Sequence, residues 1–209
     1  MTHVMIGIPS YWDESKRFLR QADPTMAALI DAYEEPPLRS QGRLFETLAR
    51  AIIGQQISAK AADAVWSRFI KLVGQVDAES VLSHTPDALF SVGLSRRKVE
   101  YILNLASRSE WLLDQAWTEM SDADVLKSLC SLRGVGPWTA EMMLIFSLLR
   151  PDVLPLGDVG VIRSIEKHYA QGERLSEAEV IAVAARWRPY RTVGVWYLWR
   201  SLDAEPVLY

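Results

Sequence analysis

The sequence predicts an all-α protein, and three observations support this fold class. Apolar residues recur with helical spacing from Leu44 to Ile53. Helix-capping residues recur along the chain, and no segment alternates between polar and apolar side chains as half-buried strands do. Residues 1–9 are the exception, because they could form a short extended arm. At 209 residues, 49% of them hydrophobic, the chain can fill the core of one domain or of two small lobes.

Capping residues and apolar stripes place the individual helices in order along the chain. After the helix at 44–53, the sequence predicts a second helix over 59–73 that has one apolar face. The residues of that face are Ala61, Val65, Phe69 and Leu72. The predicted N-caps are Ser58, Thr85 (with Pro86 in the first turn), Ser121, Asp158 and Ser176. Glu179 completes a capping box with Ser176, and Leu175 can pack on Val180 as a staple.

Composition excludes several classes of protein. No apolar run is long enough to span a membrane, and no charged-then-apolar leader is present, so we expect a cytoplasmic protein. The single Cys130 excludes an intramolecular disulfide and a four-cysteine iron–sulfur cluster. The three histidines lack the spacing of metal ligands.

The most informative segment is the run Leu132–Ala140, which reads LRGVGPWTA. Gly134 and Gly136 both permit positive φ and close approach of another backbone, and Pro137 suits the first turn of a helix. A tight hairpin of this kind directs backbone N–H groups outward beside the positive end of a helix dipole. It therefore favours binding of a phosphate, although a helix–turn–helix corner closed by glycines for packing is an equal alternative.

A single carboxylate follows the hairpin, Asp158 in the run Leu154-Pro155-Leu156-Gly157-Asp158. As the N-cap of a helix over 159–170, its charge is favoured by the helix dipole. An anion fixed beside a sugar stabilises the positive charge that develops when an N-glycosidic bond breaks, and it can orient the attacking water. Asp158 is thus the candidate catalytic residue.

These segments resemble the helix-hairpin-helix DNA glycosylase superfamily, and more narrowly its alkylated-base branch, 3-methyladenine DNA glycosylase II. The resemblance covers roughly residues 10–203. Besides the hairpin and Asp158, it rests on the runs at 50–58, 93–98, 187–191 and 196–200. The chain departs from the family at Arg133, where many members carry proline, and at Gly157, where some carry a second acidic residue.

The resemblance implies a fold of two helical lobes with a cleft between them that contains the helix-hairpin-helix motif. Longer members add an N-terminal mixed α/β domain, and we expect residues 1–209 to form one glycosylase unit without it. The implied activity is hydrolysis of the N-glycosidic bond of alkylated bases, such as 3-methyladenine or 7-methylguanine, in double-stranded DNA during base excision repair. The product is an abasic site, and the implied protein is a nucleoid-associated monomer.

Trp138 decides the subclass that the resemblance implies. Members that also cut the strand carry a lysine there, whose amine forms a Schiff base with the sugar, and tryptophan cannot. We therefore expect a monofunctional enzyme without lyase activity. Trp138 and Trp199 are expected to line the base pocket, since indole faces attract cationic rings. Met142 stands where a related enzyme has tyrosine.

The resemblance also implies how DNA is held. Gln56 occupies the position that fills the gap left by the flipped base. The other expected DNA contacts are Gly134, Val135, Gly136, Thr139, Gln55, Ser58 and Arg191. No cofactor is expected to be required, but the backbone carbonyls of Cys130, Leu132 and Val135 are candidates to hold a structural Na⁺ or K⁺.

Net charge is less typical of a DNA-binding protein. It is −3, with an isoelectric point near 5.7, whereas such proteins are usually basic. Local clusters reduce the conflict, and a hairpin that binds through backbone amides needs little side-chain charge. The clusters are Arg96-Arg97-Lys98, Arg133, Arg163 with Lys167, and Arg186, Arg188, Arg191 and Arg200.

Two alternative functions remain at this stage. A helix-hairpin-helix glycosylase for uracil, mismatched or oxidised bases would also need Asp158. A non-catalytic DNA-binding module would keep the hairpin but would have no use for Asp158.

Overall fold

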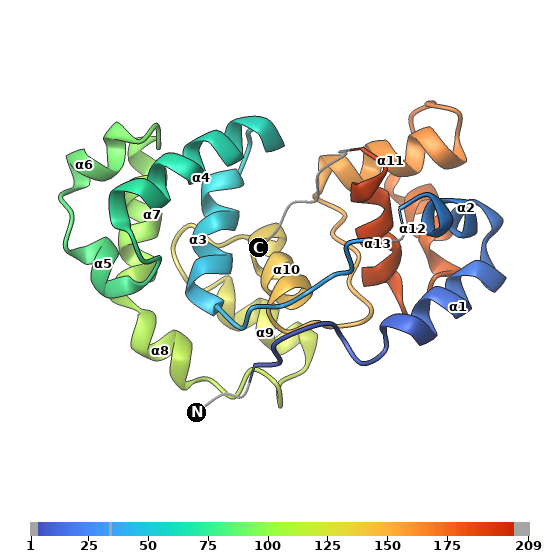
Figure 1. The fold of residues 1–209 in the computed structure, drawn as a ribbon, viewed down its shortest axis with the longest axis horizontal. Coiled ribbons are helices and arrows are strands. Elements are labelled where there is room, and N and C mark those ends of the chain that lie inside the picture. The colour runs from blue at the N-terminus through green and yellow to red at the C-terminus, as the bar shows by residue number, and fades with distance from the viewer. Residues whose placement is uncertain (1–3, 34, 203–209) are drawn as a thin grey trace. The chain divides into compact units, whose positions relative to one another are not determined.

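The structure, a computed structural model, describes residues 4–33 and 35–202 and consists of two compact helical units (Figure 1). Within these residues the only strand-like pairing is an isolated antiparallel bridge between Gly7 and Ser40. The all-α prediction is therefore confirmed. The bridge involves part of the expected N-terminal arm, of which residues 1–3 lie outside the described residues. None of the described helices is long and apolar enough to span a membrane.

The first unit contains Gln41–Leu148. Its helices are α3 (Leu44–Gly54), α4 (Ala59–Val73), α5 (Ala78–Leu82), α6 (Pro86–Ser91), α7 (Arg96–Ser107), α8 (Ser109–Asp114), α9 (Asp122–Leu129) and α10 (Pro137–Phe146). Helix α3 is central to this unit, since it contacts α4, α7, α8 and α10. Its predicted apolar stripe is buried at Leu44, Leu48 and Ile52, and Thr47 accepts a hydrogen bond from Ser147 at 2.9 Å.

The predicted face of α4 was only partly right. Phe69 is buried, but Ala61 is exposed and Leu72 is only half-buried. Trp66 and Val73 are buried instead, and the Trp66 ring stacks on Phe69 at 5.7 Å between centroids. The prediction failed because the large Trp66 ring is buried in place of its smaller neighbour Val65. The buried face of α4 is therefore shifted by one residue, from Val65 and Leu72 to Trp66 and Val73.

The second unit combines Ile6–Ser40 with the segment that starts at Leu149. Its helices are α1 (Trp12–Ala22), α2 (Pro24–Ala32), α11 (Val159–Tyr169), α12 (Glu177–Ala185) and α13 (Arg191–Arg200). Helix α13 is buried from Thr192 to Leu198 and packs on α1, α2 and α11. The fully buried Trp187 and the nearly buried Trp196 belong to this core.

A buried carboxylate, Asp23, ties the second unit together. It caps α2 by accepting the N–H groups of Thr25 and Met26, and its other oxygen accepts hydrogen bonds from Tyr169 at 3.0 Å and Trp187 at 2.9 Å. Burial and the adjacent Asp23 carboxylate raise the pKa of Tyr169 far above its usual value. Four hydrogen bonds satisfy this carboxylate, as a buried charge requires.

The predicted N-caps are confirmed. Each N-cap side chain accepts a backbone N–H of its helix, and Ser176 and Glu179 form the reciprocal capping box. The helix that follows the hairpin begins at Pro137, as expected, and ends at Phe146.

Candidate functional site

The hairpin between α9 and α10 is built on close packing at Gly134. This residue has a φ of +90°, and a Cβ there would lie 2.1 Å from Cγ of Tyr101 on α7. Only glycine accommodates both the backbone conformation and the ring. Tyr101 of α7 therefore packs directly against the hairpin at Gly134.

Gly136 has a different role from the one predicted. Its φ is −98°, its ψ is 178°, and a Cβ there would meet nothing within 4 Å, so it needs neither positive φ nor close approach. It is instead the N-cap of α10, and it provides no side chain to cap the first turn. Within the described part of the chain, the N–H groups of Gly134 and Gly136 have no hydrogen-bond partner. The hairpin thus presents unpaired donors at the positive end of a helix dipole, which suits an anion.

The turn between α3 and α4 is fastened to the hairpin through Gln55. Its side-chain N–H group donates to the carbonyl of Gly134 and to Oγ1 of Thr139, both at 2.8 Å. Nζ of Lys98 donates to the carbonyls of Ile53 and Gln55 on the other side of this turn, both at 2.7 Å. Burial lowers the pKa of Lys98. Gln55 and Thr139, predicted as DNA contacts, are thus engaged within the protein.

The next residues of the turn are exposed. Gln56 has a φ of +59°, which is rare for a residue with a side chain, and Ile57 is 41% exposed. Ser58 caps α4 by accepting the N–H of Ala61 at 3.3 Å. The bonds of Gln55 and Lys98 fix the backbone that precedes this tip, and strain of this kind persists only where the surroundings fix the backbone.

Replacing Lys98 by Met should destabilise the first unit. The variant leaves two partly buried carbonyls without their donor, so we expect a loss of about 2–3 kcal/mol in the free energy of unfolding. Urea denaturation followed by circular dichroism measures this loss. Lys71→Met, an exposed lysine on α4, is the matched control. Equal stabilities of the two variants would contradict the bracing role of Lys98.

Asp158 lies in the second unit, at the N-terminus of α11, as predicted. Its Oδ1 accepts the N–H of Val161 at 2.8 Å and the indole N–H of Trp199 at 3.0 Å. The Trp199 ring also lies against Gly160, where a Cβ would be 3.4 Å from its Cδ1. The half-buried carboxylate is therefore fixed in orientation by its own helix and by α13.

The two other predicted pocket residues lie in the first unit. Trp138 is half-buried in the first turn of α10, with its Cη2 3.9 Å from the position of a Cβ on Gly54. Met142, one turn further along, is only 1% exposed. Trp138 can therefore offer part of its ring to a ligand, whereas the buried Met142 offers almost no surface.

Most of the predicted basic residues already have partners. Arg191 forms a bidentate ion pair with Asp152, at 2.5 and 3.0 Å, and also donates to its backbone carbonyl. Arg133 pairs with Glu100 at 2.8 Å. The guanidinium groups of Arg96 and Arg97 lie over the rings of Phe90 and Tyr101. Because these arginines already interact with protein groups, less of their charge is available to a polyanion. The backbone N–H donors of the hairpin therefore become more important for binding one.

The carbonyl groups of the hairpin fit the candidate cation site in their chemistry. In the described residues, the carbonyls of Cys130 and Val135 accept no hydrogen bond, while that of Leu132 accepts the N–H of Val135 at 3.1 Å. Neutral oxygen donors suit a hard monovalent cation. Among the described residues, no group of three or more His, Cys, Asp or Glu side chains could hold a metal ion.

The sequence did not predict two contacts in the first unit, Tyr101 with Gly134 and Lys98 with the turn carbonyls. Nor did it predict the contact of Trp199 with Asp158 in the second unit. The only available signal was that Lys98 and Trp199 fall in segments that resemble the glycosylases.

Comparison with known proteins gives a consistent result. Residues 49–189 match the family model described as HhH-GPD superfamily base excision DNA repair protein. DNA-3-methyladenine glycosylase 1 of Schizosaccharomyces pombe is 32% identical over 186 residues, which cover 84% of this chain and 80% of that protein. A DNA-3-methyladenine glycosylase of Bacillus subtilis is 29% identical over 173 residues, covering 76% of this chain. The chain spans only 57% of the length of that Bacillus protein.

A solved structure also has the same fold. The Schizosaccharomyces pombe 3-methyladenine DNA glycosylase Mag1, in complex with abasic DNA, superimposes with a TM-score of 0.81 at 26% identity. The match covers 90% of this chain and 96% of the Mag1 chain.

Proposed function

Because the chain belongs to the HhH-GPD superfamily of base excision DNA repair proteins, we propose that it is a monofunctional DNA glycosylase for alkylated bases. The observation that carries the proposal is the carboxylate of Asp158, which the N–H groups of Val161 and Trp199 hold in one orientation. A binding module would have no use for an acidic group fixed in this way. The names of the relatives support the alkylated-base class.

Asp158 acts on the sugar in the proposed reaction. The bond between C1′ and the base nitrogen breaks, and its electron pair leaves with the base. A cationic alkylated purine departs as a neutral molecule, so the step needs no strong general acid. The carboxylate stabilises the oxocarbenium-like charge at C1′. Water then adds to C1′, with Asp158 accepting its proton before release to solvent.

Aromatic residues receive the flipped base. The faces of Trp138 and Trp199 attract a cationic ring through their π electrons. Trp138 carries no amine, so no covalent Schiff base forms with the sugar and the strand stays intact. Met142, predicted as a third pocket residue, is 1% exposed and so would contribute little surface to the pocket.

Double-stranded DNA is held by backbone groups more than by charged side chains. The free N–H groups of Gly134 and Gly136 receive a phosphate, with Val135 between them. Gln56, exposed at the tip of its turn, fills the gap in the duplex, and Gln55 keeps this turn fixed to the hairpin. Ser58 and Thr139 shape these two elements, and Arg191 supports the second unit through Asp152 rather than binding phosphate.

The remaining assignments complete the proposal. The two units act together as one monomeric glycosylase associated with the nucleoid. The carbonyls of Cys130, Leu132 and Val135 would hold a Na⁺ or K⁺, which when bound adds positive charge next to the hairpin phosphate.

Replacing Trp138 by Ala should reduce excision of cationic bases by more than it reduces DNA affinity. A desolvated cation–π contact contributes about 2 kcal/mol, which corresponds to a rate lower by roughly thirtyfold. Single-turnover base release and affinity for a duplex with an abasic-site analogue separate the two effects. Equal losses in both would show that Trp138 is only a scaffold residue.

A panel of damaged duplexes tests the substrate class. Wild-type protein should release free base from methylated duplex DNA and leave the strand intact until alkali is added. Duplexes with uracil, a mismatch or an oxidised purine should be processed far more slowly. Preferential release of one of these bases would contradict the alkylated-base assignment, and release of none from any duplex would contradict the enzyme itself.

A further inference from the structure

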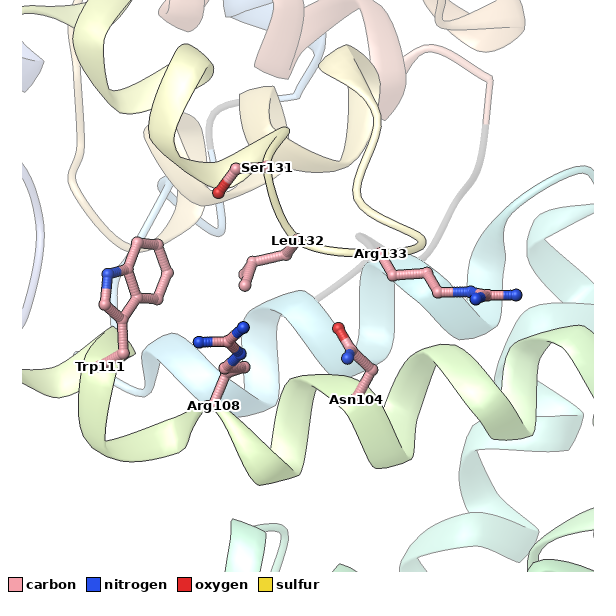
Figure 2. A pocket seen from close by; sticks show the side chains of 6 residues that line it. All are labelled: Asn104, Arg108, Trp111, Ser131, Leu132 and Arg133. Carbon is pink, nitrogen blue, oxygen red and sulfur yellow. The ribbon is translucent and has the colours of Figure 1, made fainter.

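A cavity of about 310 Å³ lies in the first unit beside the hairpin (Figure 2). Neither the proposed reaction nor phosphate binding by the hairpin involves it. Three of its residues come from α7, from α8 and from the residue that joins these two helices, and three come from the segment between α9 and α10. They are Asn104, Arg108 and Trp111, and Ser131, Leu132 and Arg133. Its volume is at the lower end of the range for small-ligand sites, about 300–1,000 Å³.

Arg108 provides positive charge at this cavity. In the described part of the chain, neither its guanidinium nor the side-chain amide of Asn104 forms a hydrogen bond or an ion pair. Figure 2 shows the Arg108 side chain directed across the cavity toward Leu132, whereas Arg133 extends away from it. Arg133 is moreover paired with Glu100. Arg108 is therefore the available charged donor of the cavity, and a guanidinium binds phosphate well.

Trp111 and Leu132 form the apolar part of the lining. The Trp111 ring forms an edge contact with the buried Trp117, with centroids 5.7 Å apart at 83°. Leu132 is 7% exposed, and its side chain points into the cavity in Figure 2. The hydroxyl of Ser131 donates to the carbonyl of Ser128 at 2.6 Å, so its oxygen remains an acceptor. An apolar wall next to an arginine matches a deoxyribose joined to its phosphate.

The cavity is also close to the hairpin along the chain. Ser131, Leu132 and Arg133 directly precede Gly134, so the cavity lining lies within about 11 Å of chain from the unpaired hairpin N–H groups. Consecutive phosphates of one DNA strand advance by about 3.4 Å along the helix axis. A strand whose phosphate binds the hairpin amides therefore passes close to segment 131–133, and Arg108 faces Leu132 of this segment across the cavity (Figure 2).

We propose that this cavity is a second backbone-binding site, in which Arg108 binds a phosphate of the DNA strand and Trp111 and Leu132 pack on its sugar. The inference rests on the proposed function and extends the DNA footprint beyond the hairpin. Arg108 would add one positive charge to the DNA-binding surface of a chain whose net charge is −3.

The site is tested with a DNA duplex that carries one abasic-site analogue and is otherwise unmodified. Its affinity is measured by fluorescence anisotropy between about 50 and 200 mM salt. Arg108→Gln should weaken binding roughly three- to tenfold and lower the slope of log affinity against log salt by about one. Asn104→Ala should weaken binding without changing the slope. Both side chains lack partners, so neither variant should alter the melting temperature.

Lys71→Gln is the control, because it removes one charge from an exposed lysine in the last turn of α4. Its affinity and slope should equal those of the wild type, and the same values for Arg108→Gln would overturn the proposal. Loss of deoxyadenosine monophosphate binding in Arg108→Gln, with DNA affinity unchanged, would also overturn it by assigning the cavity to free nucleotides. A salt slope that depends on Arg108 in a protein that releases no base would support this site and contradict the proposed function.

Discussion

Replacing Asp158 by Asn should abolish base release while the protein keeps its fold and its affinity for abasic-site DNA. In the wild type, the Asp158 Oδ1 atom lies 2.8 Å from the backbone nitrogen of Val161 and 3.0 Å from the indole nitrogen of Trp199. Asparagine keeps an oxygen that can accept both hydrogen bonds. It loses the negative charge opposite the developing cation. The loss of one such electrostatic group costs at least about 10²–10³-fold in rate. Single-turnover base release measures this loss.

The matched control for this variant is Asp77→Asn. Asp77 caps α5 by accepting the N–H of Ser80 at 2.8 Å, so the same chemical change is made at another N-cap. Asparagine and aspartate are nearly equal as N-caps, and both variants should stay within about 0.5 kcal/mol of the wild type in stability. A parallel loss of abasic-DNA affinity and base release in Asp158→Asn would contradict its assigned chemical role.

Replacing Gly134 by Ala should have the largest effect on stability. The new Cβ would lie 2.1 Å from Cγ of Tyr101, and the backbone φ of +90° is unfavourable for alanine. Steric overlap and backbone strain together should cost about 2–4 kcal/mol. This loss corresponds to a melting temperature lower by roughly 4–16 °C. DNA affinity should fall as well, because the hairpin N–H groups move.

Gly136→Ala provides the comparison within the same hairpin. Its backbone suits any residue, and a Cβ there has open space, so its stability should change by less than about 1 kcal/mol. Combining Gly134→Ala with Tyr101→Ala should cost less than the sum of the two single changes, since removing the ring relieves the overlap. Equal destabilisation by the two glycine variants would contradict the account of Gly134.

The elements of this fold could be predicted where the signal is local. The N-caps Ser58, Ser121 and Ser176, and the capping role of Asp158, depend on residues only a few positions apart, and all were predicted. The buried face of α4 was predicted less well, because packing of the Trp66 ring decides which side of the helix faces the core.

The candidate site could be predicted only in part, for the same physical reason. The sequence identifies Gly134 and Gly136 as a pair, but only the position of Tyr101 shows that one needs to be glycine and the other does not. Gln55 was predicted to contact DNA, yet its side chain binds Gly134 and Thr139, residues far away along the chain. Such contacts are set by tertiary packing, which no local pattern specifies.

The most direct test of the central claim follows one alkylated purine at a defined position in a duplex through a single turnover. Free base and strand integrity are measured in the same sample, with and without borohydride. We expect release of the base by the wild type, an intact strand that alkali then cleaves, and no protein–DNA adduct trapped by borohydride. A trapped adduct or a nicked strand would contradict the assignment of water as the nucleophile, and an unreleased base would contradict catalysis by Asp158.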